Sequence, residues 1–185
     1  MDPNNPASVL PMLPQGSAED AIYVEVGRAL TKWESLEFTL SETYEALLDA
    51  QTDGAAYGYG LLVAFTGRHA LLESAEAHLP FRDEPPFSNL RKLIARAAAL
   101  CARRNDIAHG VCAEVGGRGW FLVPAWYNSK KAPKQDFGPK FNYGVGSYAY
   151  SAEQLAIYGG HFAALNSELA PYRRQIQQRW RTQPR

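Results

Sequence analysis

The sequence predicts a mainly α-helical protein: an antiparallel, four-helix-type bundle with a small β-hairpin inserted between the third and fourth helices. Apolar residues recur every three or four positions over most of the 185 residues, which is the spacing of a buried helix face. The exception is the stretch 111–150, where short apolar runs alternate with glycine and proline. Because the links between the helical stretches are short, neighbouring helices are expected to run antiparallel.

The first half of the chain is expected to hold two helices behind an irregular arm. Residues 1–17 contain four prolines, and Ser17 precedes Ala-Glu-Asp, a pattern that predicts a helix N-cap. The first helix is expected to end near Gly54. Residues 55–79 predict a second helix, although its glycine-rich start, "AAYGYG", leaves its first residue open.

The second half is expected to hold the hairpin between two more helices. The third helix begins near Pro86, and Gly110 can adopt the left-handed conformation that closes it. The following segment, "VCAEVGGRGWFLVPAWY", predicts a hairpin that turns at Gly-Gly-Arg-Gly. Ser151 and Gln154 form a capping-box pattern for the last helix. Pro171 lies inside this helix and is expected to kink it or end it.

The domain organisation follows from these elements. We expect an arm at 1–17, one helical domain over 18–180 with a β insertion at about 111–150, and a tail at 181–185. The two cysteines lack the spacing of a zinc site or a disulfide framework, which favours a reducing, cytoplasmic setting. No membrane association is expected, because no run approaches the roughly 18 apolar residues of a membrane span.

The charge is balanced overall but unevenly distributed. Residues 1–100 carry 7 Lys/Arg and 14 Asp/Glu, a net charge of −7. Residues 101–185 carry 12 Lys/Arg and 5 Asp/Glu, a net charge of +7. The basic half is either an ordinary solvated surface or a surface that attracts a polyanion such as RNA.

Polar side chains interrupt the apolar pattern at the end of the third helix, in "CARRNDIAHGV", residues 101–111. Arg104 is expected to extend the buried stripe, where its permanent charge needs a partner or a cleft. Asn105 and His109 are four residues apart and share a face if the helix persists. A cation, an amide and an imidazole together suit phosphoryl transfer to an internal hydroxyl: His moves protons, Arg stabilises developing charge and Asn orients either group.

Residues 104–109, Arg-Asn-Asp-Ile-Ala-His, resemble the R-x4-6-H motif of the HEPN superfamily, in which a polar residue often follows the Arg. The resemblance implies an all-helical domain with the motif near a helix end. It also implies a homodimeric, metal-independent endoribonuclease, in which catalytic Arg104, Asn105 and His109 promote attack of the 2′-hydroxyl and leave a 2′,3′-cyclic phosphate. Several similar proteins are toxins or defence factors held by an antitoxin, but nothing in this sequence shows such a partner.

Alternatives stay open. The three side chains could instead bond one another and the last helical carbonyls, in a non-catalytic helical dimer that binds or scaffolds a partner. A basic loop rich in aromatics supplies weak candidates for RNA binding: Lys130, Lys131 and Lys134. The aromatics there could equally form the core of the hairpin. No metal or other cofactor is expected, because the motif comes with no acidic cluster and no H-x-x-x-H pattern.

Overall fold

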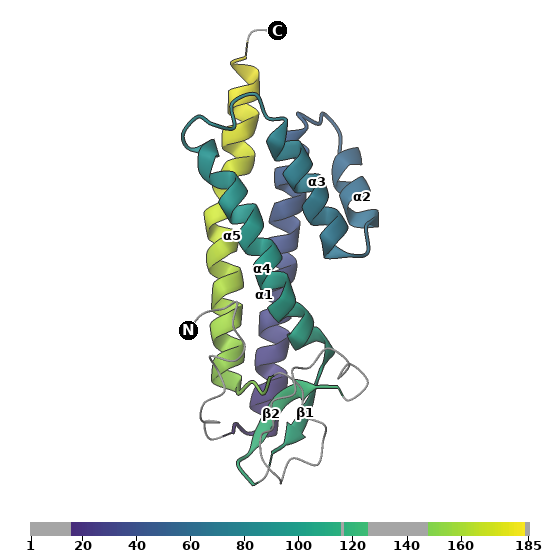
Figure 1. Cartoon of the computed structure of the whole chain (residues 1–185), viewed down its shortest axis with the longest axis vertical. Helices are drawn as coiled ribbons and strands as arrows, with labels where there is room; N and C mark the ends of the chain where they lie inside the picture. Colours follow the sequence, from purple (N-terminus) through teal and green to yellow (C-terminus); the bar gives the residue numbers. More distant parts are fainter. Residues whose placement is uncertain (1–15, 116, 126–147, 184–185) are drawn as a thin grey trace. The chain divides into compact units, whose positions relative to one another are not determined.

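A computed structural model describes residues 16–115, 117–125 and 148–183 (Figure 1). Within these residues the chain forms five α-helices and one two-stranded antiparallel hairpin, which confirms the predicted mainly helical fold. The chain divides into two compact units. Unit 1 comprises Met1–Trp33 and Ala102–His161, and unit 2 comprises Glu34–Cys101 and Phe162–Arg185. The expectation of one domain over 18–180 stays a prediction.

Unit 2 is a helical bundle. The helices of the chain are α1 (Glu19–Leu47), α2 (Gly54–Leu61), α3 (Phe65–Ala77), α4 (Leu90–His109) and α5 (Ala152–Arg181). Unit 2 contains all of α2 and α3, the C-terminal parts of α1 and α5, and the N-terminal part of α4. Helix α2 lies beside α3 (Figure 1). Burial of apolar side chains stabilises this unit. The buried side chains include Leu36, Leu40, Leu72, Leu90, Leu93, Leu165, Leu169 and Ile176.

The predicted second helix is two helices, so the prediction of one continuous helix over 55–79 is wrong. The backbone is extended at Leu62 and Ala64, where ψ is 113° and 132°. The Nε of Arg68 donates a hydrogen bond to the Leu62 carbonyl at 2.8 Å, which satisfies one of the groups exposed by the break. The glycines of α2 weaken the helix preference of the segment that precedes the break.

Other helix ends also differ from the predictions. Helix α1 ends at Leu47 rather than near Gly54, and Asp49 follows in the left-handed region with φ of 49°. A 3-10 turn, Phe87–Asn89, precedes α4 and places its first residue slightly later than predicted. Helix α5 continues through Pro171 to Arg181, so this proline does not end it.

Unit 1 contains the predicted hairpin. Strand β1 (Gly110–Glu114) pairs antiparallel with β2 (Trp120–Pro124), and Cys112 lies opposite Leu122. In the turn, Gly117 and Gly119 have φ of 71° and 104°, a backbone conformation that glycine adopts without strain. The hairpin covers a small apolar core made of Ala113, Val115, Phe121, Val123 and Ala149.

The two predicted caps have different outcomes. The capping box is confirmed: the Ser151 N–H donates to Gln154 Oε1 at 2.8 Å, and the Gln154 N–H donates to Ser151 Oγ at 3.3 Å. Ser17, predicted to cap α1, instead accepts the N–H of Ala152, the first residue of α5, on its Oγ at 2.9 Å. Its backbone pairs with Trp120 of β2, which holds the serine at this distant helix.

Gly110 does not close α4 in the left-handed conformation, so that prediction is wrong. It is the first residue of β1, and its φ lies outside the left-handed range. A Cβ at this position would come within 2.6 Å of the Leu122 Cγ on the paired strand. Glycine is therefore needed for the close approach of β2 and not for a special backbone angle.

Candidate functional site at the end of helix α4

Helix α4 persists to its last residue, His109, so Asn105 and His109 lie on one helix face as predicted. Both residues are exposed, whereas Arg104 is half-buried. The Nη1 of Arg104 donates a hydrogen bond to Asn105 Oδ1 at 3.3 Å. The final turns of α4 thus bring the guanidinium of Arg104 and the amide of Asn105 together, and they present the imidazole of His109 on the same face as that amide.

The buried arginine of this helix end is Arg103 rather than Arg104. Arg103 is 9% exposed, and Ile107 one turn later is fully buried. Steps of three and of four residues both remain near one helix face, and here the stripe continues from Leu100 to Arg103 to Ile107. The prediction that Arg104 extends the buried stripe is therefore wrong, and the need for a buried partner falls on Arg103.

Arg103 finds its partners in a cluster of polar groups. Its Nη1 lies 3.1 Å from Asp106 Oδ2 and also donates to the Tyr150 hydroxyl at 3.1 Å. The Tyr150 hydroxyl in turn donates to Asp106 Oδ2 at 3.0 Å. The neighbouring Tyr148 hydroxyl donates to the backbone carbonyl of Asp106 at 2.8 Å. These four residues tie the last turns of α4 to the segment that precedes α5.

Burial shifts the pKa values of the acidic groups in this cluster. It raises the pKa of Asp106 above its ordinary value, against the lowering effects of Arg103 and the Tyr150 hydroxyl. Burial and the nearby Asp106 also raise the pKa of Tyr148 and of Tyr150. Both phenols therefore stay protonated and remain hydrogen-bond donors at neutral pH.

Sequence reasoning missed this supporting cluster. Arg103 and Asp106 stand three residues apart, the spacing of an ion pair along one helix face, which was a readable signal. Tyr148 and Tyr150 were recognisable only as members of an aromatic-rich segment, because their partners lie 42 and 44 residues away. The proposed RNA-binding residues Lys130, Lys131 and Lys134 lie outside the described residues.

The chemistry available at the helix end is acid–base and electrostatic. Among the described residues no group of three His, Cys, Asp or Glu is placed to hold a metal ion. Burial, with a smaller contribution from Glu19, raises the pKa of the Cys112 thiol, so this cysteine is not activated as a nucleophile.

In unit 2, His69 pairs with Glu73 at 3.3 Å, in keeping with a structural role.

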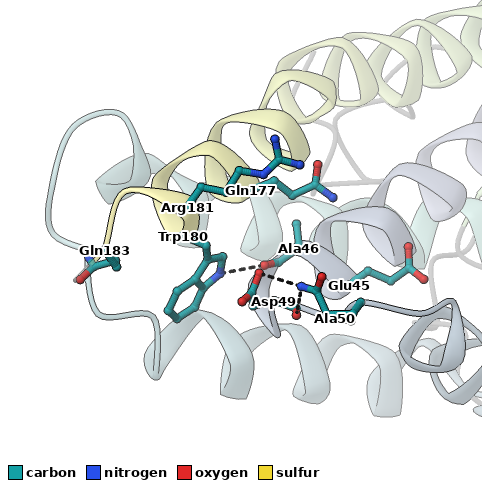
Figure 2. A pocket seen from close by; sticks show the side chains of 9 residues that line it. Glu45, Ala46, Asp49, Ala50, Gln177, Trp180, Arg181 and Gln183 are labelled. Carbon is teal, nitrogen blue, oxygen red and sulfur yellow. Dashed lines mark hydrogen bonds between the residues drawn. The ribbon is translucent and has the colours of Figure 1, made fainter. Parts of the chain in front are cut away.

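A surface pocket of about 860 Å³ lies in unit 2, between the ends of α1 and α5 (Figure 2). Trp180 forms part of the pocket wall, and its Nε1 donates a hydrogen bond to the Ala46 carbonyl at 3.0 Å. The pocket is bordered by the acids Glu45 and Asp49 and by the basic Arg181. This mixed lining selects no single class of ligand, and none of the three motif residues contributes to it.

Comparisons with known proteins leave the resemblance to the HEPN superfamily as a prediction. No family model, no curated protein and no solved structure matches this chain. Of the helices in the described residues, none is both long and apolar enough to cross a membrane.

Proposed function

We propose that the protein is a metal-independent endoribonuclease that uses Arg104, Asn105 and His109. The observation that carries the proposal is the arrangement at the end of α4. There an exposed imidazole and an exposed amide share one helix face, and a guanidinium is hydrogen-bonded to that amide. A cation, an orienting group and a proton carrier are the parts that cleavage of a phosphodiester by its own 2′-hydroxyl requires.

The reaction is intramolecular in the RNA. The ribose 2′-oxygen bonds to the adjacent phosphorus and gives up its proton to a base, while the bond from phosphorus to the 5′-oxygen breaks and that oxygen takes a proton from an acid. His109 serves in one of these proton transfers. Arg104 stabilises the charge that builds on the non-bridging oxygens, and Asn105 holds the Arg104 guanidinium in place. The products are a 2′,3′-cyclic phosphate and a 5′-hydroxyl.

A homodimer completes this proposal, because two copies supply one imidazole for each proton transfer. Support comes from apolar side chains that unit 1 leaves in solvent, Tyr23 and Val24 on α1 and Val111 on β1. Val111 follows His109 by two residues, so a surface suited to a second copy begins beside the motif. A cytoplasmic toxin or defence factor is the biological setting that fits such an enzyme, and both described cysteines are free, as in a reducing compartment.

The test is cleavage of a labelled single-stranded RNA mixture in EDTA, with analysis of the product ends. The wild type is expected to leave 2′,3′-cyclic phosphates, and His109→Ala is expected to lose at least about 100-fold in rate. His78→Ala is the matched control, because His78 is also an exposed histidine at the C-terminal end of a helix. Cleavage by His109→Ala at the wild-type rate, or no cleavage by the wild type, would count against the enzyme.

A second function, a non-catalytic binding module, is favoured by the surface of α2 and of the short link between α2 and α3. Residues 54–67 carry no charged side chain, and Tyr57, Leu61 and Val63 are 74%, 81% and 96% exposed. Apolar side chains exposed in a group mark many protein-binding surfaces. This reading predicts no turnover by the wild type, and a loss of partner binding in Tyr57→Ser with Leu61→Ser while His109→Ala still binds.

A further inference from the structure

Asp106 stands between the motif residues Asn105 and His109, and its backbone carbonyl and its carboxylate are both held by tyrosines from beyond the hairpin. The Tyr148 hydroxyl donates to its backbone carbonyl at 2.8 Å. The Tyr150 hydroxyl donates to its carboxylate at 3.0 Å. Asp106 is thus fixed through main chain and side chain at once, within the last turn before His109.

The contact to the carbonyl is the unusual one. The last four carbonyls of a helix have few partners inside the helix, and in most helices water or a cap serves them. Here a buried phenol, that of Tyr148, donates to one of these carbonyls. The Tyr148 ring also stacks on the Tyr150 ring, with centroids 4.7 Å apart and planes 13° apart, so it has little freedom to leave the carbonyl.

The tyrosine pair is itself anchored to the hairpin. The Tyr150 N–H and carbonyl both bond to Leu122 of β2 at 2.9 Å, and its ring packs edge-on against Tyr158 at 5.1 Å. Strand β1 begins at Gly110, directly after His109, and pairs with the same β2. The end of α4 is therefore held from two directions, by the covalent chain into β1 and by the tyrosine hydroxyls.

We propose that Tyr148 and Asp106 are positioning residues, which hold the last turn of α4 so that Arg104 and His109 keep a constant separation. This inference rests on the proposed ribonuclease function. Neither residue touches the RNA; they act by preventing the helix end from fraying. Loss of the Tyr148 hydroxyl removes its hydrogen bond to the Asp106 carbonyl, and His109, three residues later, then samples positions from which proton transfer is slow.

The test compares Tyr148→Phe with Tyr172→Phe in the full chain. Tyr172 is the matched control because its hydroxyl also donates to a backbone carbonyl, that of Pro86, at 3.1 Å in unit 2. Tyr148→Phe is expected to speed amide hydrogen exchange at residues 105–110 and to shift or broaden the His109 imidazole signals in NMR spectra. In RNA cleavage it is expected to lower kcat about 10-fold with KM changed less than about 2-fold. Tyr172→Phe is expected to leave all three readouts unchanged.

The outcomes separate this inference from the proposed function. Wild-type exchange and wild-type imidazole signals in Tyr148→Phe overturn the positioning role, whether or not the protein cleaves RNA. Faster exchange at residues 105–110 in a protein that does not cleave RNA supports the hold on the helix end and overturns only the reaction. If Tyr148→Phe does not fold, Tyr150→Phe serves in its place, because it removes the hydroxyl that donates to the Asp106 carboxylate and accepts from Arg103.

Discussion

Arg103 and Asp106, three residues apart on α4, form an ion pair in which Nη1 and Oδ2 are 3.1 Å apart, with side chains that are 10% and 23% exposed. The pair lies in the same final turns of α4 as the motif residues, and Tyr150 bonds to both of its members. An ion pair this poorly solvated is costly to break from one side, because the remaining charge stays buried without compensation.

Arg103→Met is therefore expected to lower the free energy of unfolding by about 2 kcal/mol, less than for a fully buried pair since Asp106 keeps some solvent contact. Arg104→Met is the neighbouring control and is expected to change this free energy by less than about 0.5 kcal/mol. Denaturant unfolding of the two variants checks the difference. Equal losses would mean that the two arginines are equally important to the fold.

Gly110→Ala is expected to destabilise the protein by about 1–3 kcal/mol. The new Cβ would lie 2.6 Å from the Leu122 Cγ and 3.0 Å from the Asp106 carbonyl, so the hairpin must shift. Adding Leu122→Val is expected to recover part of the loss. In contrast, Gly27→Ala in α1, where a Cβ meets nothing within 4 Å, is expected to stabilise by about 0.5–1 kcal/mol. Thermal unfolding of the four proteins tests this, and a harmless Gly110→Ala would contradict the close approach.

Stability is expected to fall as pH rises past the ordinary tyrosine pKa of 10.0. Burial raises the pKa of Tyr148 and of Tyr150 in the folded protein, so above this pH the unfolded chain releases protons that the folded chain keeps. The folded state then binds more protons, and its stability decreases with pH. Tyr150→Phe is expected to make this decrease shallower, whereas Tyr57→Phe, at an exposed position, leaves it unchanged. Denaturant unfolding of the wild type and of both variants between about pH 8 and 11 measures how steeply the stability of each protein falls with pH.

Arg68→Met is expected to loosen the attachment of α2 to the rest of unit 2. The Arg68 Nη1 lies 3.0 Å from Glu37 Oε2, and the hydroxyl of Tyr59 donates to the same oxygen at 3.4 Å. Among the residues of α2, Tyr59 alone is buried, so this cluster is the main hold on the helix. We expect a loss of about 2 kcal/mol and faster amide exchange over α2. The control is Arg82→Met, which breaks a more exposed pair with Asp83; equal exchange in both variants would refute the role of Arg68.

The sequence predicted well those features whose partners are close along the chain. The capping box joins Ser151 and Gln154, which are three residues apart, and the hairpin turn follows from the glycines between two apolar runs. The presence of Asn105 and His109 on one face needed only a helix that continues to residue 109. Such patterns are readable because the interaction and its spacing both lie within a few residues.

The mainly helical class, the hairpin and the gathering of polar groups at the end of α4 follow from the sequence alone. The tertiary structure decided which arginine is buried, since steps of three and four residues along a helix face are equally allowed until a partner such as Tyr150 selects one. It also decided that Ser17 serves the start of α5, 135 residues away, and that Gly110 makes room for Leu122. These choices depend on which segments far apart in the sequence come into contact. Residue spacing does not predict those contacts, because loop closure costs similar entropy for many alternative pairs of segments.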